Sequence, residues 1–203
     1  MNEYGPALVG FATATVVTMI ELVTSKYPRT AGFLISSSLR FWLYPPIYGL
    51  IAFGCILGLD ALAASGAIKL EGTFAANKWL QAVGLGLSVK ALMHIRIFSV
   101  TTDSGSFPVG IESIVQLFEP WLLDSIDMDE WQAVRRYVRA RMNTAYAAWT
   151  PAQTRAHILA NLPTKLKNSA TFTVDLNACS DTLECMELYL RRCGRSIFDL
   201  TFP

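Results

Sequence analysis

The run FWLYPPIYGLIAFGCILGL at residues 41–59 contains no charged side chain. The hydrocarbon core of a bilayer is about 30 Å thick, and roughly 20 mainly apolar residues in a helix cross it. Two further apolar stretches flank this run: residues 4–20 hold no charge, and residues 79–89 hold none before a mixed segment to Val100. The sequence therefore predicts a mostly α-helical membrane protein with three transmembrane helices, at about residues 5–24, 41–62 and 79–99.

The second half of the chain has the composition of a soluble domain. Residues 1–100 carry seven basic and four acidic side chains, whereas residues 101–203 carry ten and twelve. A slightly acidic domain does not favour direct binding of nucleic acid. We expect a transmembrane domain at 1–100, a linker rich in turn residues at 101–110 and a cytoplasmic domain at 111–203.

Basic residues predict the orientation in the membrane. Glu3 precedes the first apolar run and no Lys or Arg does, which does not resemble a cleavable signal peptide. Lys26, Arg29 and Arg40 lie between the first two predicted spans, and the positive-inside rule places such a loop in the cytoplasm. We therefore expect a multi-pass protein of the cell inner membrane, with its N-terminus outside and its C-terminal domain in the cytoplasm.

Helical signals dominate the predicted cytoplasmic domain. Residues 111–122 repeat apolar side chains at helical spacing up to a break or kink at Pro120, and form either an amphipathic helix on the membrane surface or a helix of the soluble core. A second helix is expected at 128–148, with Asp127 before its first residue. A third begins at Thr150-Pro-Ala-Gln153, which has the pattern of a capping box with Pro at the first helical position.

The last part of the chain changes its period. Residues 170–176 and 198–202 alternate apolar with other side chains, which predicts two strands. Between them, residues 181–193 have the spacing of a helix, and Gly194 follows as a stop signal. The sequence therefore predicts a β-α-β unit at the C-terminal end of the small helical domain.

Polar residues near the third predicted span form a candidate functional site. Gly86, Lys90 and His94 recur every four residues, so they share one helical face. Arg96 follows near the inner interface, and Glu21 reaches a similar depth in the first span. Charges at such positions often mark a path or a relay, so this polar seam is expected to line a pore or to couple the tail to the spans. Alternatively, Lys90 snorkels towards the interface while His94 and Arg96 are cytoplasmic flank.

The segment RRYVRAR at 135–141 provides a second candidate site. Arg135, Arg136 and Arg139 would lie on the polar side of the 128–148 helix, where guanidinium groups bind phosphate, an anionic lipid, a nucleotide or a partner protein. The alternative is a charged helix face that only meets solvent.

Catalytic and metal-binding patterns are weak. His157 stands beside Arg155 with no cysteine or carboxylate motif at a recognisable spacing. Cys179, Cys185 and Cys193 are separated by five and seven residues, which matches neither a zinc site nor a thioredoxin motif. We expect no enzymatic activity, no metal and no cofactor.

The layout of three predicted spans followed by a small helical tail resembles the small membrane subunits of bacterial anti-phage defence systems, and its size is similar to that of the membrane subunit of the Kiwa system. The resemblance lies in the architecture of the whole chain, and no motif or residue carries it. It implies an oligomer that works with a cytosolic partner. The Kiwa-type subunit has four spans, whereas a fourth span here would have to come from 107–126, where Glu112, Glu119 and Pro120 oppose it.

Two functions follow as hypotheses. Because three spans enclose no sizeable pore, the first is a homo-oligomeric, channel-like defence effector that is gated through its cytoplasmic tail. The alternative is a non-conducting membrane anchor or sensor that recruits a cytosolic protein through the arginine face or through an exposed strand edge.

Overall fold

The computed structural model describes the chain except for residues 1–3, 67–76, 94–95, 103–104 and 168. The chain divides into two compact units. The first comprises Met1–Lys26 and Leu39–Ile126, and the second comprises Tyr27–Ser38 and Asp127–Pro203. Each unit buries its own cluster of apolar side chains.

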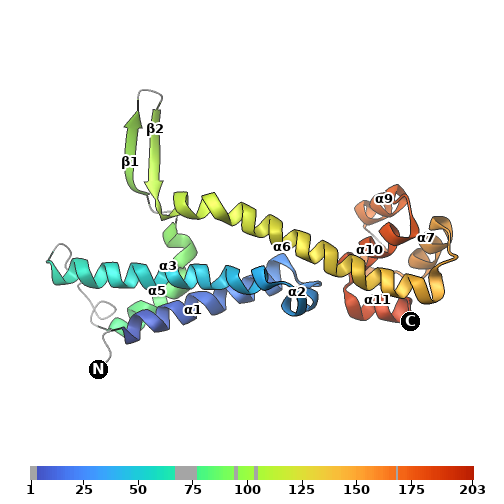
Figure 1. The fold of residues 1–203 in the computed structure, drawn as a ribbon, viewed down its shortest axis with the longest axis horizontal. Helices are drawn as coiled ribbons and strands as arrows, with labels where there is room; N and C mark the ends of the chain where they lie inside the picture. The colour runs from blue at the N-terminus through green and yellow to red at the C-terminus, as the bar shows by residue number, and fades with distance from the viewer. Residues whose placement is uncertain (1–3, 67–76, 94–95, 103–104, 168) are drawn as a thin grey trace. The chain divides into compact units, whose positions relative to one another are not determined.

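The first unit is built from long helices and one hairpin (Figure 1). Its elements are α1 (Gly5–Glu21), a π-helical turn η1 (Leu22–Lys26), α3 (Leu39–Ala64), α5 (Lys78–Met93), the antiparallel strands β1 (Arg96–Thr102) and β2 (Gly105–Gly110), and the first half of α6 (Ile111–Arg141). The segment 101–110, expected as a linker, belongs to this hairpin wherever it is described.

Small residues set the packing of α1 against its two neighbours. Gly10 of α1 faces Ile56 of α3, and Gly49 of α3 faces Thr15 of α1, so these helices run antiparallel. Trp79, near the start of α5, lies against Gly5, so α5 runs parallel to α1. Ala7, Ile56 and Ala82 form the buried cluster where the three helices meet.

Two of the described helices are long and apolar enough to cross a membrane: Gly5–Lys26, with 22 residues, and Leu39–Ala64, with 26. Only 28% and 22% of their most apolar windows are buried inside the protein. A core helix of a soluble protein would be mostly buried, whereas these helices leave most of their apolar surface to be covered by something else. They indicate association with a membrane.

The prediction of a third span at 79–99 is wrong. Helix α5 ends at Met93 after 16 residues, and the chain is already extended as β1 from Arg96. Sixteen helical residues cover about 24 Å, which is short of the bilayer core. The apolar residues that follow Lys90 belong in part to a strand, and an apolar run alone does not distinguish a strand from a continued helix.

Helix α6 also differs from expectation. It runs without interruption from Ile111 to Arg141, through both Pro120 and the predicted start at Asp127. Buried side chains on either side of these positions, including Leu122 and Val134, hold the helix by tertiary packing. Tertiary packing here outweighs the local signals for a break and for a new N-terminus.

The second unit consists of short helices around the C-terminal half of α6 (Figure 1). They are α2 (Ala31–Ser37), the π-helical turn η2 (Met142–Tyr146), α7 (Pro151–Ala160), α8 (Thr164–Lys167), α9 (Ala170–Ala178), α10 (Thr182–Cys193) and α11 (Arg195–Thr201). The capping box at the start of α7 is confirmed: Thr150 Oγ1 accepts the Gln153 N–H at 3.3 Å, and Gln153 Oε1 accepts the Thr150 N–H at 2.9 Å.

The predicted β-α-β unit is wrong, because residues 169–203, all of which the structure describes, contain no strand. Phe172 and Leu176 of α9 are buried, whereas Val174 between them is 67% exposed. Positions i and i+4 share a face in a helix as well as in a strand, so the buried pair satisfied both patterns. An exposed strand edge is therefore not available in this segment for a partner.

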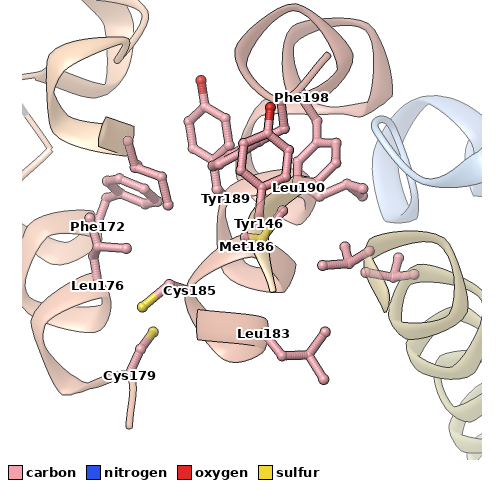
Figure 2. Packing of buried hydrophobic residues seen from close by; sticks show 14 of the residues in the cluster. Tyr146, Phe172, Leu176, Cys179, Leu183, Cys185, Met186, Tyr189, Leu190 and Phe198 are labelled. Atoms are coloured by element: carbon pink, nitrogen blue, oxygen red, sulfur yellow. The ribbon is translucent and has the colours of Figure 1, made fainter. Parts of the chain in front are cut away.

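The core of the second unit gathers side chains from α10 and its neighbours (Figure 2). Tyr189 and Met186 of α10 are fully buried, and so are Phe198 and Phe202, which lie four residues apart at α11 and its end. The rings of Phe198 and Phe202 are 5.1 Å apart. Gly194 allows the sharp turn between α10 and α11, since its φ of 86° lies in the region that favours glycine.

Candidate functional site

A polar cluster in the first unit joins two buried tyrosines of α3 to a half-buried glutamate of α6. Tyr44 and Tyr48 lie one turn apart and donate their hydroxyl hydrogens to Glu119 Oε1 at 2.5 and 2.6 Å. The two hydroxyl oxygens are 3.0 Å apart. Tyr44 is 4% exposed and Tyr48 is 2% exposed. We call these three residues the tyrosine–glutamate cluster.

This cluster gives a carboxylate two partners inside the protein. Hydrogen bonds to a carboxylate are stronger than neutral ones, and they offset the cost of partly burying Glu119. Glu21, the last residue of α1, acts electrostatically on Tyr48. The arrangement can fix α6 against α3.

Sequence reasoning missed the role of Glu119 and treated this residue only as an obstacle to a fourth span. The available signal was the spacing of Tyr44 and Tyr48, which places two polar ring ends on one face of an apolar helix. Their carboxylate partner lies 75 and 71 residues away in sequence, so no local pattern could have identified the pairing.

Gly86 of the predicted polar seam lies at a close contact between α5 and α1. A Cβ at this position would lie 2.8 Å from the carbonyl oxygen of Gly10 and 2.8 Å from Thr13 Cβ. Glycine therefore allows the two backbones to approach one another, as small residues do between packed membrane helices.

The structure does not bring the remaining seam residues together in a described arrangement. Glu21 ends α1 and is exposed. Lys90 lies on α5 and Arg96 begins β1, but their side chains are outside the part of the chain whose side chains are described. His94 lies outside the described residues. The polar seam stays a prediction.

The three arginines of the predicted partner face have different surroundings. Arg136 is exposed and donates from Nε to the Gln132 carbonyl oxygen at 3.4 Å, and Arg139 is exposed as well. Arg135 instead turns towards α10: its Nε lies 3.7 Å from Glu187 Oε1. Arg136 and Arg139 remain available on the surface of the second unit.

The segment Tyr27–Ser38, which we call the connection, joins α1 to α3 and belongs to the second unit. The Tyr27 hydroxyl donates to Asp127 Oδ1, and the Ser38 hydroxyl donates to Asp129 Oδ2 at 2.7 Å. Tyr27 and Ser38 are both buried. Each end of the connection is therefore hydrogen-bonded to α6.

The middle of the connection is held by apolar packing. The Phe33 ring lies 5.2 Å from that of Tyr137, and the Arg195 guanidinium lies 5.8 Å from the Phe33 ring centre. Tyr137 donates its hydroxyl to Asp199, and Arg195 pairs with the same carboxylate at 3.6 Å. Sequence reasoning treated this segment only as a loop, although buried apolar residues such as Leu34 are unusual in a solvent-exposed turn.

The four cysteines are free thiols. Cys179 follows α9 and Cys185 lies on α10, and Figure 2 shows their sulfur atoms pointing towards each other. Burial raises the pKa of Cys185 to about 12 and raises the pKa of Cys179 as well. Because the thiolate is the nucleophile, both thiols are poorly suited to nucleophilic catalysis.

Comparisons with protein-family models, with curated proteins and with solved structures found no match to this chain.

Proposed function

We propose that the protein is a membrane-anchored sensor whose helical second unit binds a cytosolic partner and passes its state to the two candidate spans. One observation carries the proposal: the connection between these spans, Tyr27–Ser38, is folded into the second unit. A change in that unit therefore acts directly on the residues that lead into α1 and α3.

The contacts of the connection support such a transmission. Tyr27 directly follows the first candidate span and Ser38 directly precedes the second, and both are hydrogen-bonded to α6. Phe33 contacts Tyr137, whose hydroxyl reaches Asp199 of α11. A rearrangement of α11 can thus reach the connection through a short series of packed and hydrogen-bonded groups.

The orientation is part of the proposal. Lys26, Arg29 and Arg40 flank or lie within the connection, so the positive-inside rule places it in the cytoplasm. Because the connection and residues 127–203 form one unit, we propose that residues 127–203 lie on the cytoplasmic side as well. The N-terminus is then outside the inner membrane, and further copies of the chain cover apolar surface that lipid does not. We propose that the protein works in a bacterial defence system.

A channel-like effector is the second candidate, favoured by the tyrosine–glutamate cluster. Tyr44 and Tyr48 lie within a candidate span, and buried ionisable groups in such segments often mark an ion or proton path. In an oligomer, Glu119 would then contribute to that path.

One experiment on full-length protein in liposomes tests the sensor. Spin labels at Leu8→Cys and Leu62→Cys, both exposed in the wild type, report the distance between the outer ends of α1 and α3. Cys55 and Cys193 are replaced by serine. We expect Asp129→Ala to shift or broaden this distance, whereas Ser36→Ala, which removes bonds only within α2, leaves it unchanged.

Two outcomes would contradict the proposal. The first is an unchanged distance in Asp129→Ala although hydrogen exchange at Phe33 shows that the connection has been released. The second is a potassium leak from the same liposomes that Glu119→Gln abolishes, because this result supports the channel-like effector instead.

A further inference from the structure

Two pairs of charged residues face each other where α6 packs on α10. Arg135 and Arg139 are four residues apart on α6, and Glu187 and Arg191 are four residues apart on α10, so each pair shares a helical face. Arg135 Nε lies 3.7 Å from Glu187 Oε1, which shows that the two faces meet. We call these four residues the α6–α10 arginine cluster.

Several buried polar atoms of this cluster have no hydrogen-bond partner among the residues that the structure describes. They are Nε of Arg135, Nε and Nη2 of Arg191, and Oε1 of Glu187. Guanidinium groups carry five N–H donors in a fixed geometry, so a single distant carboxylate cannot satisfy them. A buried donor without an acceptor costs about 1–3 kcal/mol, and such groups in native proteins call for an explanation such as a bound ion.

The cluster has an excess of positive charge. Arg135, Arg191 and Arg139 all act on Glu187, and Asp181 is the further acid that acts on it. Burial raises the pKa of Glu187 in spite of the three arginines, so its negative charge is held less firmly than that of an exposed glutamate. The cluster therefore has more guanidinium groups than carboxylates to pair them.

We propose that the α6–α10 arginine cluster binds the phosphate group of a soluble phosphate compound or of an anionic lipid. A phosphate group offers several acceptor oxygens and up to two negative charges, and arginine binds it with paired N–H donors. The phosphate oxygens accept hydrogen bonds from those N–H groups of Arg135 and Arg191 that do not bond to Glu187. It reaches them from the solvent side, since Arg139 is exposed and the Arg135 side chain is 36% exposed.

The site deepens the proposed sensor, because it lies in the unit that would detect a signal, but its binding test does not depend on transmission to the spans. Full-length protein is placed in nanodiscs of phosphatidylcholine, and inorganic phosphate is added at constant ionic strength against chloride. The readout is the hydrogen exchange of the α6 and α10 backbone. A second set of nanodiscs contains phosphatidylglycerol and receives no added phosphate.

The variants are Arg191→Gln and its matched control Arg192→Gln. Arg192 is the next residue on α10 and forms an exposed ion pair with Asp175 at 3.2 Å. Arg191→Gln removes buried donors that have no acceptor, so we expect it to fold at least as stably as the wild type. We expect phosphate or phosphatidylglycerol to slow exchange at least threefold in the wild type and in Arg192→Gln, and to have no effect in Arg191→Gln.

The two sets of nanodiscs distinguish the sources of phosphate. Protection by inorganic phosphate alone identifies a soluble ligand, and protection by phosphatidylglycerol alone identifies a lipid headgroup. Protection in neither set overturns the proposal, and so does equal protection in Arg191→Gln and the wild type. If Asp129→Ala leaves the spin-label distance unchanged, the sensor proposal is contradicted, whereas the result on phosphate binding still stands.

Discussion

The hydroxyl of Ser38 lies 2.7 Å from Asp129 Oδ2, although 91 positions separate the two residues in sequence. Ser38 is 3% exposed and immediately precedes α3. The bond fixes the C-terminal end of the connection to α6 within the second unit. The connection between the two candidate spans therefore folds with residues 127–203, which follow much later in the sequence.

The first prediction concerns this bond. Ser38→Ala removes a buried hydrogen bond to a carboxylate, and we expect it to lower the free energy of unfolding by about 1–3 kcal/mol. Denaturant unfolding of the full chain in detergent, followed by tryptophan fluorescence, measures the change. Ser36→Ala is the control, since Ser36 is exposed and bonds only to carbonyl oxygens of α2. Equal losses for the two variants would show that the contact with Asp129 contributes nothing.

The second prediction compares two glycines. A Cβ at Gly86 would lie 2.8 Å from the Gly10 carbonyl oxygen, a backbone atom, whereas a Cβ at Gly54 meets nothing within 4 Å. We expect Gly86→Ala to destabilise the first unit by about 1–3 kcal/mol through overpacking. Gly54→Ala should be neutral or slightly stabilising, because alanine has the higher helix propensity. Thermal unfolding in detergent measures both, and a loss of stability in Gly54→Ala alone would refute the assigned contact.

The third prediction concerns the tyrosine–glutamate cluster. Glu119→Ala removes the carboxylate that accepts hydrogen bonds from the hydroxyls of Tyr44 and Tyr48, and we expect a loss of at least about 2 kcal/mol in the free energy of unfolding. Glu119→Gln keeps an acceptor oxygen and should cost less. Asp124→Asn, an exposed change on the same helix, should stay within about 0.5 kcal/mol of the wild type. Unfolding by sodium dodecyl sulfate in mixed micelles ranks the three variants, and a different order would contradict the geometry.

Local signals in the sequence predicted local structure well. The capping box of Thr150 and Gln153 and the stop at Gly194 depend on side chains and backbone within one helical turn, so a short window contains all the information. The start predicted at Asp127 was local too, yet α6 continues through it. The difference is that buried residues on both sides of Asp127, such as Ile126 and Val134, pack into the two units and stabilise one long helix.

The sequence did not allow us to predict contacts between distant residues, or to choose between strand and helix where the spacing of apolar residues fits both. Phe198 and Phe202 fit a strand and a helix equally well in sequence, whereas the structure forms the helix Arg195–Thr201 and leaves Leu200 between them 83% exposed. Glu119 finds Tyr44, and Asp129 finds Ser38, across distances in sequence that no pattern spans. The candidate site was missed for this reason: its polar groups become partners only after the helices have packed.

The last prediction concerns the dependence of stability on pH. Burial raises the pKa of Cys185 from its ordinary value of 9.0 to about 12. Between these values the unfolded chain loses the thiol proton while the folded chain keeps it, so deprotonation favours unfolding. The stability contributed by Cys185 is therefore complete below pH 9 and is lost as the pH rises towards 12. The raised pKa values of Cys179 and Tyr189 act in the same direction.

Cys185→Ala tests this dependence by its slope. The variant loses packing and is less stable at every pH, but it lacks the thiol, so its free energy of unfolding should fall less steeply between pH 9 and pH 11 than that of the wild type. Denaturant unfolding at a series of pH values measures the slope, and Met186→Ala, which loses packing in the same core but removes no titratable group, serves as the control. Parallel curves for Cys185→Ala and the wild type would mean that the thiol does not stay protonated in the folded core.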